Sequence, residues 1–255
     1  MSMYHDNLTI LIQGPLDLTS INAIKNYKQF GKVVVSSWKD MNVENLEHLL
    51  AHKNIKTVLK EMPDINDIVG ADKKSTFYYA LTSMYNGLKE TDTEFVLKTR
   101  SDEFYGNLFP FLESMENDKI ICGNIFVRND ASYHFGDHIF LCKTKYLLKG
   151  VEELLKCYTK KKPLQSWMIQ GPHIAETILC KSILKHMNLV DSSKFDIQIG
   201  QKINSQAKET FLNNIEIIDI NRCSPFTASW GSANKKYINN FSNHHRVRDN
   251  YDYRS

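Results

Sequence analysis

The chain is poor in cysteine and shows no cysteine pattern. Its 255 residues include five cysteines, and no two of them have the Cys-x-x-Cys spacing. The odd number and the missing pair argue against a disulfide framework and against a zinc knuckle. We expect these residues to pack as small apolar side chains in a protein kept in a reducing compartment: Cys122, Cys142, Cys157, Cys180 and Cys223.

The sequence also lacks a long apolar run. No stretch approaches the roughly eighteen apolar residues that a membrane-spanning helix requires. Residues 1–7 are polar and do not contain the apolar region of a signal peptide. The sequence therefore predicts a cytoplasmic protein whose contact with membranes is at most peripheral.

Most of the chain has no excess of either charge. The formal net charge is +3, and residues 235–255 account for all of it with five Lys or Arg against two Asp. Residues 1–234, which we expect to form one domain, are neutral and lack the basic and aromatic stripe of a nucleic-acid binder, so no nucleic-acid partner is expected. The basic C-terminal tail, 235–255, suits phosphate or an anionic membrane surface, although a solvated tail fits the sequence equally well.

The order of apolar runs and helical periods predicts an α/β fold. Apolar runs predict strands at 8–12, 32–36 and 55–59. Helical periods predict helices between them, from an N-cap at Thr19 or Ser20 to about residue 28, and from 42 to 51. This alternation is typical of βαβ units, and hence of a mainly parallel central sheet flanked by helices.

A further series of elements is expected in the rest of the chain. The pattern predicts helices at 73–90, 108–115, 144–157 and 172–187, and strands at 94–97, 119–124, 125–127, 133–141 and 215–220. The strand at 133–141 would hold Gly136 and Asp137 between apolar residues. Glycine inside a strand often marks the close approach of a backbone or a ligand, which makes this point a candidate site.

A dense polar cluster follows the expected strand 94–97, and it consists of Lys98, Arg100, Asp102 and Glu103. Ligands of open α/β sheets bind outside the carboxyl ends of the strands. Carboxylates at such a point suit a hard divalent cation that is shared with substrate phosphates. A solvated strand end with local Arg–Asp pairing explains the cluster equally well. For a shared site, the strands ending at Gln13, Ser36 and Asp102 must open on one edge of the sheet, and we expect that they do.

Three blocks of sequence carry a resemblance to a known family. They are Ile-Leu-Ile-Gln-Gly-Pro at 10–15, Val-Val-Ser-Ser-Trp at 34–38 and Leu-Lys-Thr-Arg-Ser-Asp at 97–102. In this order and spacing they resemble the WavE-type family of lipopolysaccharide-synthesis glycosyltransferases. Phe-Gly-Asp at 135–137 and the region 172–176 are similar to the second half of that family. The resemblance covers roughly residues 8–187.

The resemblance implies a glycosyltransferase of GT-A type, with a Rossmann-like sheet. Such an enzyme transfers a sugar from a UDP- or GDP-linked donor to a glycan, glycolipid or glycoprotein acceptor, usually with Mn²⁺ or Mg²⁺. Its cation is held by an Asp-x-Asp pair at a strand end. Here Arg100 stands at the first acidic position, which leaves Asp102 as the metal ligand and Glu103 as its helper.

The remaining roles follow from the chemistry of the transfer. The turn of Gln13, Gly14 and Pro15 would lie against the nucleoside, and Ser36, Ser37 and Trp38 would bind the donor at the next strand end. Lys98 and Arg100 would stabilise the negative charge that develops on the leaving diphosphate.

An inverting transfer also needs a carboxylate base, and two residues are candidates. Glu176 is the first choice and Asp137 the second. Each also has a structural interpretation, because acids are favoured in the first turn of a helix, and a buried carboxylate can be held by a partner. The neighbouring histidines His134, His138 and His173 are candidates for substrate binding.

Two other functions are compatible with the residues. Arg100 in place of the usual acid favours a non-catalytic nucleotide-sugar or carbohydrate-binding domain, or a degenerate transferase. A nucleotidyltransferase uses similar sheets and substrates, but the only glycine close after the first strand is Gly14, which falls short of a glycine-rich phosphate loop.

Overall fold

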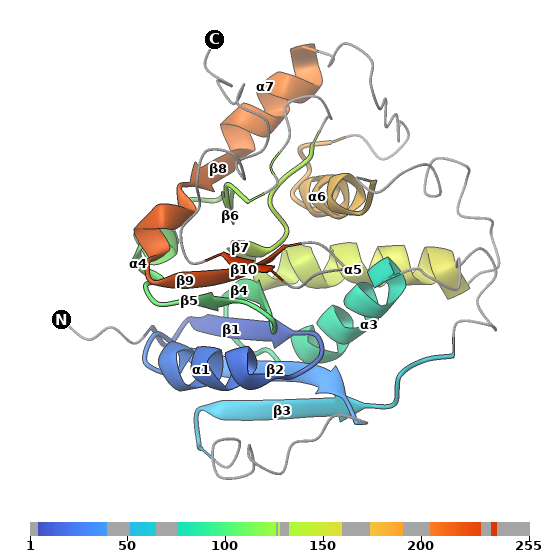
Figure 1. Cartoon of the computed structure of the whole chain (residues 1–255). Coiled ribbons are helices and arrows are strands. Elements are labelled where there is room, and N and C mark those ends of the chain that lie inside the picture. The colour runs from blue at the N-terminus through green and yellow to red at the C-terminus, as the bar shows by residue number, and fades with distance from the viewer. Residues whose placement is uncertain are drawn as a thin grey trace.

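The molecule is built on a seven-stranded sheet with the strand order β3-β2-β1-β4-β7-β6-β8 (Figure 1). The computed structural model describes residues 5–39, 52–64, 76–125, 127, 133–159, 174–190, 205–230 and 236–238. The strands of this sheet are β1 (Leu8–Gln13), β2 (Lys32–Trp38), β3 (Ile55–Lys60), β4 (Phe95–Arg100), β6 (Ile120–Gly123), β7 (Ile139–Lys143) and β8 (Ile215–Ile218). Pairs β1–β2, β1–β4, β2–β3 and β6–β8 are parallel, and only β7 runs antiparallel to its neighbours β4 and β6. The expected α/β fold with a mainly parallel sheet is confirmed.

Helices cover both faces of the sheet. They are α1 (Leu18–Tyr27), α3 (Thr76–Leu88), α4 (Phe109–Leu112), α5 (Thr144–Thr159), α6 (Ile174–His186) and α7 (Ser205–Asn214), with a 3₁₀ turn η3 at Ile220–Cys223. Successive side chains of a strand point to opposite faces. Accordingly Ile10 and Ile12 join the core cluster beneath α1 and α4, whereas Leu11 joins the one beneath α3, α5 and α6. Burial on both faces explains the continuous apolar runs that predicted these strands.

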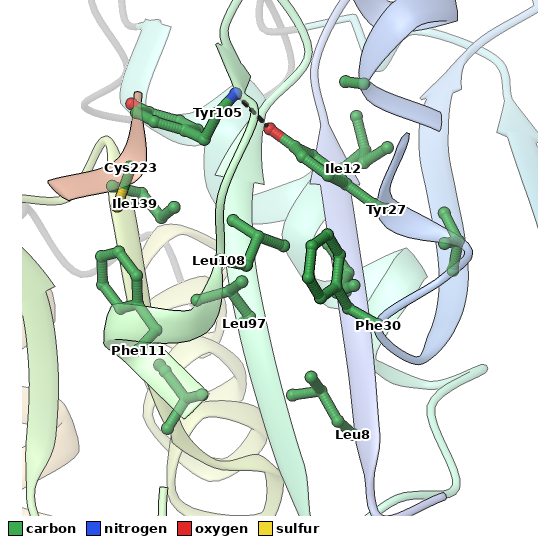
Figure 2. Close-up of a cluster of buried hydrophobic side chains, with 14 of the residues drawn as sticks. Leu8, Ile12, Tyr27, Phe30, Leu97, Tyr105, Leu108, Phe111, Ile139 and Cys223 are labelled. Carbon is green, nitrogen blue, oxygen red and sulfur yellow. Dashed lines mark hydrogen bonds between the residues drawn. The ribbon is translucent and has the colours of Figure 1, made fainter. Parts of the chain in front are cut away.

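Figure 2 shows the core cluster on the α1 side, where aromatic rings fill the space between the helix and the sheet. Tyr27 and Phe30 belong to this cluster together with Leu8 and Leu97 (Figure 2). The hydroxyl of Tyr27 accepts a hydrogen bond of 2.9 Å from the backbone N–H of Tyr105. This bond ties α1 to the strand that follows the polar cluster.

A second, antiparallel sheet was not expected from the sequence. It has the order β10-β9-β5 and consists of β5 (Phe104–Tyr105), β9 (Phe226–Trp230) and β10 (Lys236–Ile238). Its first strand begins directly after the polar cluster. The cluster is therefore held between two sheets, with β4 before it and β5 after it.

The predicted strands at 125–127 and 133–138 are wrong. Ile125 lies in a turn, Val127 has no regular structure, and β7 begins only at Ile139, so that Asp137 lies in an irregular segment and not in a strand. The reason is a close crossing of backbones, because a Cβ on Gly136 would stand 2.1 Å from the carbonyl oxygen of Gly123. Gly136 marks a close approach of two backbone segments, as expected, but it lies before β7 and not within a strand of the sheet.

Smaller differences concern the ends of elements. Helix α1 begins two to three residues early, because its N-cap is Asp17, which forms a capping box with Ser20. The last strand ends at Ile218, because Asp219 caps the 3₁₀ turn. The expected helix at 42–51, most of the tail 235–255 and the side chain of Cys157 lie outside the described residues. The four cysteines Cys122, Cys142, Cys180 and Cys223 are buried and unpaired, as predicted.

Three strand ends meet at one edge of the sheet, as predicted. Gln13 stands in register with Ser36 on one side and with Arg100 on the other. The ladder continues past the strands, since the N–H of Gly14 donates to the carbonyl of Ser36 at 3.2 Å and the N–H of Ser101 donates to that of Gln13 at 3.0 Å. Because β7 is antiparallel and pairs Ile139 with Thr99, the residues just before it reach the same edge.

The turn at this edge depends on Gly14, and we predict that Gly14→Ala destabilises the protein. Its φ is +125°, and an added Cβ would lie 2.7 Å from the Oγ of Ser101. We expect the free energy of unfolding to fall by about 1–3 kcal/mol, measured by urea denaturation. The double variant with Ser101→Ala separates the two causes, because it removes the steric contact and leaves the φ unchanged. Unchanged stability of Gly14→Ala would contradict this account of the turn.

Candidate functional site

Charged side chains from three parts of the chain gather at the edge where β1, β2 and β4 end. Lys98 and Arg100 come from β4, Asp137 precedes β7, and Glu176 stands in the first turn of α6. Their mutual electrostatic influence shows that they are neighbours: the pKa of Glu176 responds to Asp137, Lys98 and Arg100. The structure thus brings together the predicted cations and both predicted bases.

Arg100 and Asp102 form a two-point ion pair. The Nε of Arg100 lies 2.9 Å from Oδ1 of Asp102, and Nη2 lies 2.9 Å from Oδ2. Burial lowers the pKa of the guanidinium, but Asp102 and Glu103 outweigh it, so that the pKa of Arg100 is raised above its ordinary value. The local Arg–Asp pairing that the sequence left open is therefore present.

Glu103 is a fully buried carboxylate with partners on both oxygens. Oε1 contacts Nδ1 of His138, and Oε2 accepts a hydrogen bond of 2.7 Å from the hydroxyl of Tyr105. Burial alone would raise the pKa of Glu103, but His138 outweighs it and the pKa is lowered. Sequence reasoning missed Tyr105, because Glu103 precedes the short strand β5, which the sequence pattern does not predict.

The two carboxylates differ in how well they suit the expected cation. The oxygens of Asp102 have the right chemistry for Mn²⁺ or Mg²⁺, and its side chain is 20% exposed, but a cation would have to displace Arg100. A cation at Glu103 would have to displace His138 and Tyr105 inside the core. Among the described residues, no group of three or more His, Cys, Asp and Glu is placed to hold a metal ion. Metal binding by Asp102 and Glu103 remains a prediction.

The predicted donor residues on β1 and β2 lie at the correct edge, and several already have structural partners. Ser36 donates from Oγ to the carbonyl of Ser83 at 2.6 Å, and Ser83 donates back to the carbonyl of Ser36 at 2.9 Å, which fastens β2 to α3. Trp38 is buried against the ring of Tyr79 at 6.1 Å between centroids. The hydroxyl of Ser37 is buried without a hydrogen-bond partner in the described structure.

The turn that follows β1 is only partly accessible. Gln13 and Gly14 are buried, whereas Pro15 is exposed. The carbonyl of Pro15 accepts a hydrogen bond of 2.5 Å from Oγ of Ser101, which joins this turn to the polar cluster. Contact of these three residues with a donor remains a prediction.

Lys98 lies beneath the site rather than on its surface. Its residue is only 2% exposed, and its Nζ donates a 2.5 Å hydrogen bond to the backbone carbonyl of Asp137. Burial lowers the pKa of the ammonium group, and the Asp137 carboxylate opposes that shift. In this conformation Lys98 holds the segment 133–138 in place. Its charge could act on a donor diphosphate only through space, without direct contact.

The two candidate bases have pKa values shifted in opposite directions. Burial acts to raise the pKa of Asp137, but Lys98, His138 and Arg100 outweigh it and the pKa is lowered. Burial and the charge of Asp137 raise the pKa of Glu176 to about 8. The Oε2 of Glu176 has no hydrogen-bond partner in the described part of the chain. Two carboxylates whose environments separate their pKa values are a frequent feature of acid–base sites.

Comparison with known proteins gives a distant likeness. No protein-family model matches the chain, and no curated protein matches it. Similar solved structures include the glycosyltransferase GlyE of Streptococcus pneumoniae TIGR4, with 12% identity and a TM-score of 0.44 over 68% of this chain and 42% of that one. TarS of S. aureus is 10% identical with a TM-score of 0.43, and the match covers 71% of this chain and 34% of TarS. The 4-diphosphocytidyl-2C-methyl-D-erythritol synthase of Anaerococcus prevotii DSM 20548 is 12% identical with a TM-score of 0.43. This match covers 92% of this chain and 93% of the synthase.

These comparisons leave the function open. At such identities and scores they carry no argument about activity, and the chain spans less than half the length of GlyE and of TarS. The resemblance to the WavE-type family therefore remains a prediction. Among the helices that the structure describes, none combines the length and apolar character that crossing a membrane requires.

We predict that Lys98→Met destabilises the protein. The change leaves the carbonyl of Asp137 without the Lys98 donor and removes the cation that contributes most to lowering the pKa of Asp137. The free energy of unfolding should fall by about 2–4 kcal/mol, as measured by chemical denaturation. The exposed Lys156→Met on α5, which loses a surface pair with Glu152, should change it by less than about 0.5 kcal/mol. Equal stability of the two variants would show that Lys98 has no holding role.

Proposed function

We propose that the protein is a glycosyltransferase that moves a sugar from a nucleotide-sugar donor to a glycan or glycoconjugate acceptor. The observation that carries this proposal is the pair of carboxylates with opposite pKa shifts, which stand beside Arg100 at the edge where three strands end. A carboxylate whose pKa is raised towards neutral pH is a stronger proton acceptor once ionised, and an adjacent cation can stabilise a leaving anion.

In the proposed reaction Glu176 is the base. It takes the proton of an acceptor hydroxyl, and that oxygen attacks the anomeric carbon of the donor from the face opposite the diphosphate. The bond from this carbon to the diphosphate oxygen breaks, and its electron pair leaves with the nucleoside diphosphate. The anomeric configuration is inverted.

Arg100 and Asp137 are proposed to hold the donor. Asp102 occupies Nε and Nη2 of Arg100, so Nη1 is the nitrogen that a phosphate oxygen would meet. The ionised Asp137 is suited to accept hydrogen bonds from sugar hydroxyls. A divalent cation bound to Asp102 would supply further neutralisation of the diphosphate charge.

A non-catalytic nucleotide-sugar-binding domain is the second candidate. The ion pair between Arg100 and Asp102 favours it, because it occupies the carboxylate that a metal-dependent transferase would use. Product analysis distinguishes these functions. A transferase releases a nucleoside diphosphate from its donor, a binding domain releases nothing, and a nucleotidyltransferase would instead release pyrophosphate.

The test begins with a thermal-shift screen of UDP- and GDP-sugars, each with Mn²⁺ and with a chelator. A ligand that binds only the native state raises the apparent melting temperature. Donors that raise it are then assayed for release of nucleoside diphosphate. The proposal fails if no nucleotide-sugar binds, or if one binds and is never cleaved with any glycan acceptor offered.

We predict that Asp102→Asn weakens cation-dependent donor binding. The amide keeps the shape but loses the charge that would hold Mn²⁺, and the donor Kd in Mn²⁺ should rise at least about tenfold. The measurement is calorimetric titration of the donor in Mn²⁺ and in excess chelator. Asp92→Asn, which alters an exposed pair with Lys32, is the control and should bind as the wild type does. Wild-type binding that is equally tight in chelator would mean that the protein holds the diphosphate without a cation.

We predict that Glu176→Gln and Asp137→Asn affect different kinetic constants. Removing the base should lower kcat by about 10²–10⁴-fold and leave the donor Kd nearly unchanged. Asp137→Asn should chiefly weaken donor binding. Wild-type kcat/KM should rise with pH through a midpoint of about 8 and level off above it, because Glu176 must lose its proton to act as a base, and Glu176→Gln should abolish this dependence. If Asp137→Asn lowers kcat and Glu176→Gln weakens donor binding, the two roles are exchanged. Retention of the anomeric configuration in the product would exclude a general-base role for both residues.

A further inference from the structure

The proposed reaction gives no role to His134, a buried side chain beside Glu176. The Nε2 of His134 lies 3.9 Å from Oε2 of Glu176. The side chain of His134 is 1% exposed and that of Glu176 is 22% exposed. A substrate can therefore reach Glu176, whereas His134 lies behind it.

The charged groups around Glu176 come from every side of the edge. Asp137 approaches from the segment before β7, and Lys98 and Arg100 approach from β4. On α6 itself, the buried Lys181 lies farther along, with its Nζ over the ring of Tyr133 at 5.8 Å. Asp137 is ionised beside Lys98, so a second negative charge at Glu176 is unfavourable, and one proton must remain in its vicinity.

The segment that carries His134 is fixed on both sides. Tyr133 before it has a φ of +60°, a conformation that non-glycine residues rarely adopt. After it, Gly136 packs against the carbonyl of Gly123, and the carbonyl of Asp137 is held by Lys98. The imidazole is thus held at its place behind Glu176.

We propose that His134 and Glu176 share one proton as a coupled pair, and that His134 is a positioning residue that sets the pH at which Glu176 can accept a proton. This rests on the proposed function for its kinetic part only. The proton taken from the acceptor hydroxyl binds Oε2 of Glu176, and it can reach Nε2 of His134 once the 3.9 Å between these two atoms closes to hydrogen-bond distance. The pair then carries that proton in two forms, a neutral acid beside a neutral imidazole, or a carboxylate beside an imidazolium.

The direction of each effect follows from these two forms. Replacing His134 with a side chain that cannot be protonated removes one of the two forms that hold the proton, so the remaining form on Glu176 should lose that proton at lower pH. Replacing Glu176 with Gln removes the anion that favours the imidazolium, so His134 should lose its proton at lower pH. Groups coupled in this way shift each other by about one pH unit or more.

The first experiment follows the imidazole rings by NMR in protein labelled at histidine. In the wild type the signals of His134 should titrate in steps shared with Glu176, and in Glu176→Gln the midpoint should fall by at least about one pH unit. The matched control is His186, which ends α6 and pairs with Glu153 at 3.0 Å. Its midpoint should be the same in both proteins. A midpoint of His134 that does not move in Glu176→Gln overturns the proposal, whether or not the protein transfers sugars.

The second experiment compares pH profiles of kcat/KM. In His134→Gln the rising part of the profile should move to lower pH by about one unit, while the plateau value of kcat stays within a few-fold of wild type. His186→Gln should leave the profile unchanged. His134→Asn, a smaller neutral amide, repeats the test if the Gln variant does not fold. If the pH profile of kcat/KM is unchanged in a folded His134 variant, the proposal is contradicted. If no donor is turned over by the wild type, the proposed function fails and the NMR result alone decides on the pair.

Discussion

Lys98 places a cation inside the edge of the sheet, and the surrounding chain compensates for that charge. An ammonium group withdrawn from water is costly unless it has hydrogen-bond partners and a neighbouring anion. Its Nζ reaches the carbonyl of Asp137, and the carboxylate of Asp137 supplies the anion. This arrangement fixes the backbone before β7, and through it the positions of Asp137, His138 and His134. The geometry of the candidate site therefore depends on one buried lysine that a ligand does not need to contact.

The same edge holds more acids than bases, and the surplus is distributed among different partners. Asp102 is paired with Arg100, Glu103 with His138 and Tyr105, and Asp137 with Lys98. Glu176 comes last and finds no hydrogen-bond donor for Oε2 in the described structure, and burial together with the charge of Asp137 raises its pKa to about 8. The proton on Glu176 is thus a consequence of how the other charges are arranged. Its pKa would change if any of the neighbouring pairs were broken.

The sequence predicted the central strands and the shared edge, because both depend on local patterns. Continuous apolar runs predicted β1, β2, β3 and β4, and parallel strands with helical crossovers necessarily end on the same side. The short strands β5, β9 and β10 escaped prediction, because two to five residues in polar surroundings carry no period of their own. The segment before β7 was taken as a strand for a similar reason. Its conformation is set by the contact between Gly136 and Gly123, which no local pattern reveals.

Prediction of the site was limited in the same way. Lys98, Arg100 and Asp102 are adjacent in sequence, so their clustering was visible, and the pairing of Arg100 with Asp102 was foreseen as one of two alternatives. The burial of Lys98 was not foreseen, because a lysine at a strand end is usually solvated. Glu176 was identified from its place near the start of a helix. Its nearness to Lys98 and Arg100 depends on how α6 packs, and the sequence contains no direct sign of that.

A structural role alone does not account for this concentration of charge. Buried ion pairs are often no more stabilising than apolar side chains of similar size, and an acid held partly protonated by its neighbours reduces stability as the pH rises. For Glu176 the sign is clear: its pKa is higher in the folded protein than in the unfolded chain, so the folded state binds more protons between about pH 4.5 and 8, and stability falls across that range. A fold selected only for stability would gain by placing an amide or an apolar residue there. A carboxylate kept at this cost, beside Arg100 and at the point where three strands end, is consistent with the proposed role of Glu176 as a proton acceptor.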